Sequence, residues 1–270
     1  RLDVLYSAQH VFDSRDDADA RTDPSATLRR NDSFHHFQTR WSSGWGSSSE
    51  FAAGFGMTQA ILGSAFQPDA TGASTIDLPL LKRTGSAPLA TSGLRARYVF
   101  NASIRGIRRG PLGSHSLDAG GSFNYGRITN RWDSLAGVDQ VLVNGQGSEV
   151  IRWNTFTEVR QHVRDVSLYV QDSWRFLDAF VISWGLRLEE SGGRASGANG
   201  RVRWTTLDPR AGLAIPLGVH GLNLRASWSR YSEFLQGRYL DFGNPSALGG
   251  EVFAWQDGNN DRQAQPQEIG

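Results

Sequence analysis

The sequence predicts an all-β chain that forms an antiparallel, up-and-down transmembrane β-barrel. Segments of about 11 residues alternate apolar and polar side chains, as strands that face lipid on one side require. The gaps between these segments are alternately long and short, which is typical of a barrel with loops at one rim and tight turns at the other. The clearest strand covers residues 180–188, and its apolar face carries Phe180, Ile182, Trp184, Leu186 and Leu188.

The composition agrees with membrane crossing by strands rather than by helices. The chain has 270 residues, no cysteine and a net charge of +1. It is 39% hydrophobic with a mean hydropathy of -0.42, and no run of apolar residues has the length that a transmembrane helix needs. A barrel escapes this requirement because only every second residue faces lipid. The near-zero net charge argues against nucleic acid as a partner.

The first five strands are expected over residues 2–12, 34–45, 51–57, 94–104 and 116–125. In each of them apolar or aromatic side chains recur with the two-residue period of a strand. The strand at 94–104 carries Arg95 and Arg97 on its second face, which therefore needs water or counter-charges and is expected to line a wet lumen. With Arg105, these arginines are candidates for attracting an anionic solute or for pairing with carboxylates such as Asp118.

Loops are expected at 13–32, from the third strand to about residue 92, and at 127–164. Short turns are expected at 46–49 and 108–113. The gap at 127–164 is also expected to contain β-structure beyond the barrel, because Ile151, Trp153, Thr155 and Thr157 alternate with other residues.

The remaining strands are expected over residues 166–176, 179–189, 207–217 and about 224–228. Leu177 and Asp178 form a hairpin-length gap between the first two of these, and a turn is expected at 218–222. Residues 191–200 are expected to form a loop, and residues 232–270 a long polar segment. The alternation predicts two opposite faces: outward Phe100, Trp184, Leu186, Leu188 and Leu224, and inward Arg97, Gly185, Arg187 and Arg225.

The count of about nine strands implies that residues 1–270 are part of a larger barrel domain. Bacterial single-chain barrels have an even number of strands. The chain also opens inside a strand pattern at Arg1-Leu2-Asp3 and has no visible signal peptide. We therefore expect a fragment of a barrel, with two strand edges that need partners.

Four motifs in the third quarter of the chain carry a resemblance to a known family. The segments YVQDSW (169–174), GLR (185–187), DPRAGLA (208–214) and LRASWSRY (224–231) resemble consecutive strands of TonB-dependent outer-membrane receptors. Within that superfamily, they most resemble the Oar-like group, whose members contain a carboxypeptidase regulatory domain. Together the motifs cover about 167–231; the N-terminal half matches in pattern only.

This resemblance implies a location in the bacterial outer membrane, in contact with its lipid. It implies a barrel of about 22 strands, an N-terminal plug domain that contacts the TonB complex, and uptake of a large or scarce solute without enzymatic activity. Neither a plug nor a TonB box is visible in this chain. The identity of the solute cannot be read from the irregular loops.

Three alternatives remain open from the sequence. A passive porin would have a barrel of 16 to 18 strands and an open channel. An omptin-like enzyme would need facing Asp and His side chains at the loop rim, and none is convincingly in register. A soluble β-rich binding module would need no lipid on its apolar faces.

One segment near the C-terminus resembles a calcium-binding loop. Asp257, Asn259, Asp261 and Glu268 occupy positions 1, 3, 5 and 12 of the D-x-[DN]-x-[DN]-G-x5-E pattern, and Gln263 would offer its backbone carbonyl. Calcium prefers six to eight such oxygens. Arg262 stands where this loop needs glycine, so the alternative interpretation is a solvated turn. No other cofactor is expected.

The remaining polar residues suggest structural roles. Asp172 falls on the outward face beside Trp174, where a carboxylate is costly unless it lies near a rim and is hydrogen-bonded. His35 and His36 are neighbours in a strand and must point to opposite faces. The other histidines, at positions 10, 115, 162 and 220, are scattered, and no catalytic motif is present.

Overall fold

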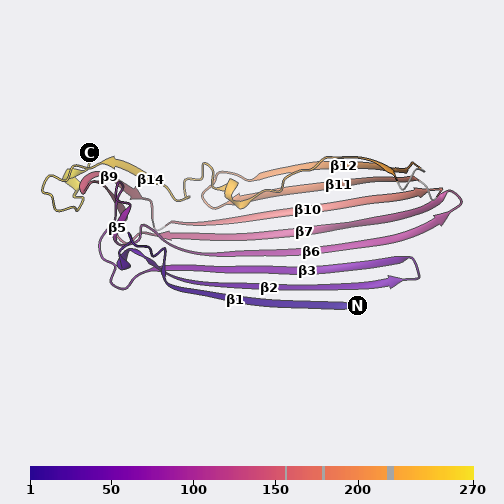
Figure 1. The fold of residues 1–270 in the computed structure, drawn as a ribbon, viewed down its shortest axis with the longest axis horizontal. Helices are drawn as coiled ribbons and strands as arrows, with labels where there is room; N and C mark the ends of the chain where they lie inside the picture. Colours follow the sequence, from indigo (N-terminus) through magenta and orange to yellow (C-terminus); the bar gives the residue numbers. More distant parts are fainter. Residues whose placement is uncertain (156, 178–179, 218–221) are drawn as a thin grey trace.

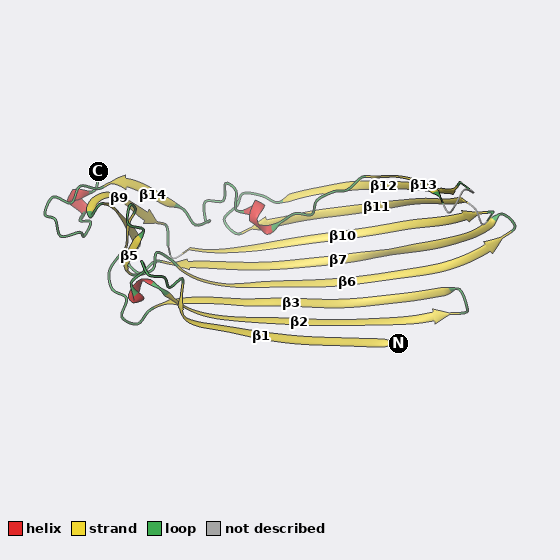
Figure 2. Ribbon diagram, in the orientation of Figure 1, coloured by secondary structure: helices red, strands yellow, loops and turns green. Residues whose placement is uncertain are grey.

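The computed structural model describes residues 1–155, 157–177, 180–217 and 222–270. The described chain consists of two β-sheets and three short 3-10 helices, η1 (Pro24–Ala26), η2 (Gly237–Leu240) and η3 (Pro266–Glu268), with no α-helix in these ranges (Figure 2). The expected all-β class is therefore confirmed.

The main sheet is an antiparallel meander of nine strands in chain order (Figure 1). The strands are β1 (Leu2–Asp16), β2 (Leu28–Trp45), β3 (Ser49–Phe66), β6 (Ala90–Gly110), β7 (Gly113–Asp133), β10 (Thr157–Phe176), β11 (Phe180–Ala195), β12 (Val202–Pro216) and β13 (Asn223–Ser229). Each pairs with its neighbour in this order, as expected. Within the described ranges β1 and β13 are the two edges, and the sheet does not close on itself.

The two ends of the main sheet differ in the length of their connections. At the turn end, three residues at 46–48 join β2 to β3, and Pro111 and Leu112 join β6 to β7. The expected turn at 177–178 and the turn at 218–222 include residues outside the described ranges. All the long connections lie at the opposite, loop end (Figure 1).

The long connections contribute a second sheet at the loop end, with the strand order β14-β9-β8-β4-β5. Its strands are β4 (Ser74–Asp77), β5 (Lys82–Gly85), β8 (Val138–Val143), β9 (Gln146–Trp153) and β14 (Gly250–Ala254). β4 and β8 are parallel, and the other pairs are antiparallel. Its small core contains Leu142, Val150 and Trp255. β8 and β9 confirm the β-structure expected in 127–164.

Several strands run further than the alternation predicted. β3 reaches Phe66, β7 reaches Asp133 and β10 begins at Thr157, so part of each expected loop is strand. The backbone pairing continues beyond the segments whose side chains alternate regularly, and part of the extension is buried, because Val159 and Val163 of β10 pack against the segment that follows β13. The expected loop up to residue 92 also contains β4 and β5, and the polar segment after 232 contains β14.

The chain after β13 folds back over the main sheet near the loop end. Leu235 and Leu240 pack with Val159, Val163 and Ala195 in a buried apolar cluster. The backbone N–H of Leu235 donates to Ser191 Oγ at 3.0 Å, which fixes this segment on β11.

Candidate functional site

The outer face of the main sheet is apolar and exposed. Side chains predicted to point outward have exposed fractions of 52% for Phe100, 47% for Trp184 and 45% for Leu188. The neighbouring inward position, Gly185, is buried, and Arg187 is half-buried. In β11 this exposure pattern agrees with the predicted division into two faces, whereas Arg97 and Arg225, which were also predicted to point inward, are exposed. The outer face has a wide apolar surface that the described residues leave uncovered.

Aromatic side chains border this apolar surface at both ends. Towards the turn end, Trp41 contacts Phe51 with ring centroids 5.6 Å apart, and Trp174 contacts Phe176 at 4.9 Å. Towards the loop end, Tyr98 stacks on Tyr125 at 6.4 Å.

The two aromatic rows are separated by a distance that suits a bilayer. Along β7 they lie about ten residues apart, from His115 beside Trp174 to Tyr125, or about 33 Å of strand. A strand tilt of about 40° would reduce this to about 25 Å, which is the height of the apolar band of outer-membrane barrels.

The opposite, concave face carries a ladder of charges and hydrogen bonds. Asp118 pairs with Arg105 at 3.1 Å and accepts hydrogen bonds from Tyr169 Oη at 3.0 Å and Gln171 Nε2 at 3.2 Å. Arg187 pairs with Glu189 on the same face. The predicted alternative of pairing between an inward arginine and Asp118 is thus correct for Arg105. Arg97 instead donates to Asn124 Oδ1 at 3.3 Å.

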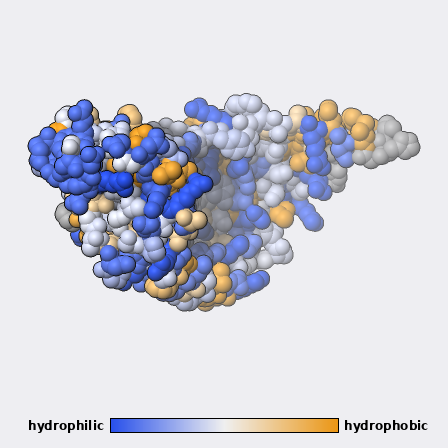
Figure 3. All heavy atoms as spheres, turned by 60° about the vertical axis from the view of Figure 1, so that its left-hand side comes forward, coloured by the Kyte–Doolittle hydropathy of each residue, from blue (hydrophilic) through white to orange (hydrophobic). Residues whose placement is uncertain are grey.

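A hollow of about 570 Å³ lies on the concave face towards the turn end. Polar side chains from β6, β7, β10, β11 and β12 line it, among them Arg105, Ser116, Asp118, Gln171, Ser183 and Arg210. The space-filling view shows a hollow beside the loop end, whose surface is largely hydrophilic (Figure 3). The concave face can therefore hold water or a polar solute.

Asp172 has the hydrogen-bonded position that the sequence analysis expected. Its side chain is on the outer face near the turn end, only 6% exposed, and His115 Nδ1 lies 2.7 Å from its Oδ2. The His115 ring stacks on Trp174 with centroids 5.3 Å apart. The partner of Asp172 was not predicted, although His115 stands directly opposite Trp174 in the register.

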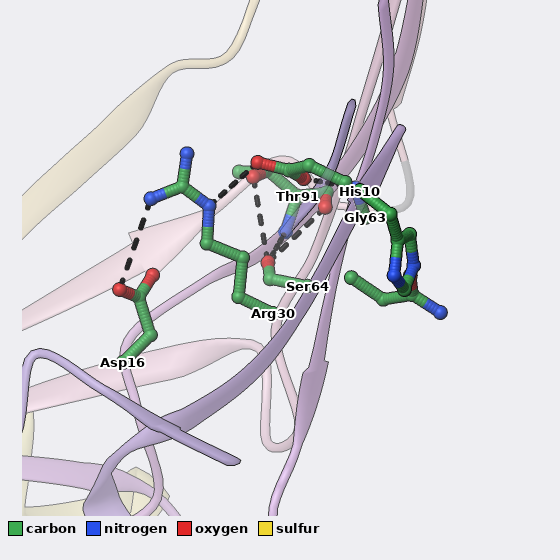
Figure 4. A network of polar contacts seen from close by, with 8 residues as sticks. His10, Asp16, Arg30, Gly63, Ser64 and Thr91 are labelled. Carbon is green, nitrogen blue, oxygen red and sulfur yellow. Dashed lines mark hydrogen bonds and ion pairs between the residues drawn. The ribbon is translucent and has the colours of Figure 1, made fainter. Parts of the chain in front are cut away.

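A polar network holds the loop ends of the first strands together (Figure 4). Arg30 reaches Asp16 at 3.9 Å and Asp32 at 2.6 Å, and the buried Asp32 accepts a hydrogen bond from the backbone N–H of Gly63 at 3.0 Å. Ser64 Oγ accepts from the backbone N–H of Thr91 at 2.7 Å. These contacts tie β1, β2, β3 and β6 together where the long connections begin.

The segment 257–268 brings the predicted metal-ligand carboxylates together. One oxygen each of Asp257, Asp261 and Glu268 lies within 4.8 Å of the others. The backbone N–H groups of Asp261 and Arg262 donate to the Asp257 carboxylate at 3.1 and 2.9 Å. Asn259 Nδ2 donates to Asp261 at 3.0 Å, so it also lies at this cluster.

Arg262 adopts the backbone conformation of the glycine that it replaces. Its φ angle is 60°, in the left-handed region that the sharp turn of a calcium loop demands. Its guanidinium lies near Gly145 of the second sheet. The backbone N–H of Gln263 donates to Asp261 Oδ1 at 2.8 Å. The geometry is compatible with an ion, and calcium binding stays a prediction.

In the second sheet, a carboxylate that the sequence did not single out holds the turn between β8 and β9. Asp77 accepts hydrogen bonds from the backbone N–H groups of Asn144 at 3.2 Å and Gly145 at 2.7 Å. These two residues have φ angles of 52° and 79° and form the turn between β8 and β9. An Asn-Gly pair between two strand segments is a strong hairpin signal and predicts this turn.

The histidines do not form a common site in the described part of the chain. His35 and His36 point to opposite faces, as expected: His35 contacts Tyr6 Oη and His36 contacts Thr58 Oγ1. The Asp–His pair that does form, His115 with Asp172, lies near the turn end rather than at the loop rim that an omptin-like enzyme would use. His220 lies outside the described residues.

The chain matches no model of a known protein family and no curated protein. No helix in the described ranges is long and apolar enough to cross a membrane. The features that bear on function are the two faces of the main sheet and the second sheet at the loop end.

Proposed function

We propose that this chain forms part of the wall of a transmembrane β-barrel in the bacterial outer membrane. One observation carries the proposal: the same nine strands present an apolar, exposed outer face between two aromatic rows and a polar, charged concave face. A water-exposed protein gains nothing from such an outer band, whereas lipid would cover it. The unpaired edges of β1 and β13 would pair with further strands of the barrel.

We further propose that the barrel belongs to a TonB-dependent receptor that takes up a large or scarce solute. The four family-like motifs support this proposal because they lie in four consecutive strands, β10 to β13, although the last extends two residues beyond β13. The second sheet would form an ordered surface for solute capture at the loop end. A plug domain outside this chain would couple the barrel to the TonB complex.

The membrane location can be tested with single cysteines, because the chain has none of its own. Ile182 lies on the outer face of β11, and its neighbour Ser183 lies on the concave face beside the hollow. In vesicles of lipids brominated on their acyl chains, a fluorescent label on Ile182→Cys should be strongly quenched. The matched label on Ser183→Cys should be quenched much less. Equal quenching at the two positions would contradict the proposal.

Energised uptake can be separated from passive diffusion in living cells. Mass spectrometry of the medium should first identify the solutes that producing cells take up and that cells lacking the protein leave in the medium. Adding an uncoupler to producing cells should then abolish uptake of such a solute but leave its binding at the cell surface. Uptake that persists without the proton gradient would favour the passive porin.

A further inference from the structure

The outer face changes from apolar to basic close to the aromatic row at the loop end. Leu168, Leu188 and Leu207 lie side by side in register on β10, β11 and β12, and their exposed fractions range from 45% to 59%. Four to six residues further towards the loop end, the exposed outward side chains are arginines. They form what we call the outer arginine cluster: Arg164, Arg194, Arg201 and Arg203.

The outer arginine cluster surrounds a hollow of about 240 Å³. The hollow forms over Gly192, where a side chain would meet the backbone of Val202 and the Cβ of Arg203. His162 also lines it, and the ring of His162 stacks on Tyr125 with centroids 5.9 Å apart. The hollow is thus continuous with the aromatic row that borders the apolar surface.

The charge in this hollow is unbalanced. Glu190 is the carboxylate that lines it, and it is shared by Arg164 at 2.7 Å and Arg203 at 2.6 Å. Arg194 and Arg201 form no ion pair with a described residue. Four arginines and one carboxylate line the hollow, which leaves an excess of three positive charges there.

We propose that the outer arginine cluster binds the phosphate group of a lipid head-group. Guanidinium groups match phosphate oxygens with paired N–H donors, and a basic hollow at the edge of an apolar surface is placed where lipid phosphates lie. The acyl chains of the same lipid would cover Leu168, Leu188 and Leu207. This inference rests on the proposed membrane location and adds a specific lipid contact to it.

The test uses a fluorescent label on Thr205→Cys, between Arg203 and Leu207 on the outer face of β12. The labelled chain is placed in phosphatidylcholine vesicles that contain equal mole fractions of either brominated phosphatidic acid or brominated phosphatidylcholine. Quenching should be several times stronger with phosphatidic acid, and this preference should weaken at high salt because the interaction is electrostatic.

The double variant Arg194→Gln/Arg201→Gln should lose most of this difference in quenching, because each arginine contributes about fivefold to the affinity for the anionic lipid, the equivalent of about 1 kcal/mol. The control Arg15→Gln/Arg21→Gln removes the same charge from two exposed arginines, one near the end of β1 and one in the connection from β1 to β2, and should keep the preference.

The outcomes separate this inference from the proposed function. Equal quenching by the two brominated lipids would overturn the phosphate site and leave the membrane location standing. Quenching by neither lipid would overturn both. Loss of the preference on adding millimolar inorganic phosphate at constant ionic strength would show a site for free phosphate instead of lipid, and would overturn the lipid proposal.

Discussion

Asp172 shows how a single carboxylate is accommodated on an apolar face. Its side chain is shielded from solvent and accepts a hydrogen bond from a histidine of the neighbouring strand β7. An unpaired carboxylate on a lipid-facing surface would be costly, with the cost falling towards the interface. The position near the turn end, with Trp174 alongside, fits that requirement.

Replacing Asp172 by alanine should lower the free energy of unfolding by about 1 to 3 kcal/mol, because His115 would lose its partner. The measurement is urea unfolding of the chain in detergent micelles. The matched variants are His115→Ala and the double substitution, whose effects should be less than additive. Fully additive effects would show that the two side chains do not act together.

The loop 257–268 should bind calcium through Asp257, Asn259, Asp261 and Glu268. Calcium should then protect this loop from protease, and Asp257→Ala/Glu268→Ala should abolish the protection. Asp133→Ala, which removes a carboxylate outside the loop, is the control. Equal cleavage of the unmodified chain in calcium and in chelator would show that the segment is a solvated turn and not a calcium site.

At the scale of elements, the nine strands of the main sheet were predictable because one face of each is apolar. In the second sheet, β-structure was expected where β8 and β9 lie, whereas β4, β5 and β14 were not predicted. β4 and β5 have four residues each, too few for a two-residue period to be recognised. Their pairing is also distant in sequence: Ser74 pairs with Asp139, and Gly250 with Trp153.

The clustering of the candidate metal-binding carboxylates was predictable because they are close together in the sequence, within one loop. The outer arginine cluster was not, since it combines residues of β10, β11 and β12 through their register. The hollow also depends on the missing side chain of Gly192, which no spacing rule reveals.

Asp139 should make the second sheet sensitive to pH. Burial raises the pKa of Asp139, and the nearby polar groups of Trp153 and Ser74 and the charge of Arg83 only partly oppose this. The folded sheet therefore binds the proton more tightly than the unfolded chain, so stability is fully present below the unfolded value of 3.8 and is lost as pH rises through the folded pKa.

Asp139→Asn should consequently stabilise the second sheet by roughly 1 kcal/mol at pH 7, and have little effect at pH 3. Hydrogen exchange of the β8 and β9 amides, corrected for the intrinsic rate at each pH, measures this difference. Glu149→Gln removes an exposed carboxylate of the same sheet as a control. An equal effect of Asp139→Asn at both pH values would contradict the assignment.

At the scale of the whole molecule, the accessible surface is too large for a compact protein in water. It is 16905 Å², whereas a compact monomer of 29.7 kDa would expose about 11,600 Å². The excess comes from a sheet that is exposed on both faces over much of its area and has two open edges. Such edges and apolar faces favour association.

In detergent-free water the isolated chain should therefore form heterogeneous aggregates, and in micelles it should become monodisperse with a β-rich spectrum. Size-exclusion chromatography with light scattering and circular dichroism would follow this change. A sharp, cooperative melt of a detergent-free monomer would count decisively against the membrane interpretation.

The unequal ends of the main sheet also determine how such a protein could enter a bilayer. The turn end carries short connections, such as the two residues Pro111 and Leu112, whereas the loop end carries an entire second sheet with many charged groups. Dragging that sheet through hydrocarbon would require dehydrating its charges, at a cost of several kcal/mol for each ion. Spontaneous insertion into preformed vesicles should then be vectorial, with the hairpin tips advancing across the membrane and the second sheet remaining outside. In the cell, where the loop end has to reach the outer surface, the second sheet should fold only after it has crossed.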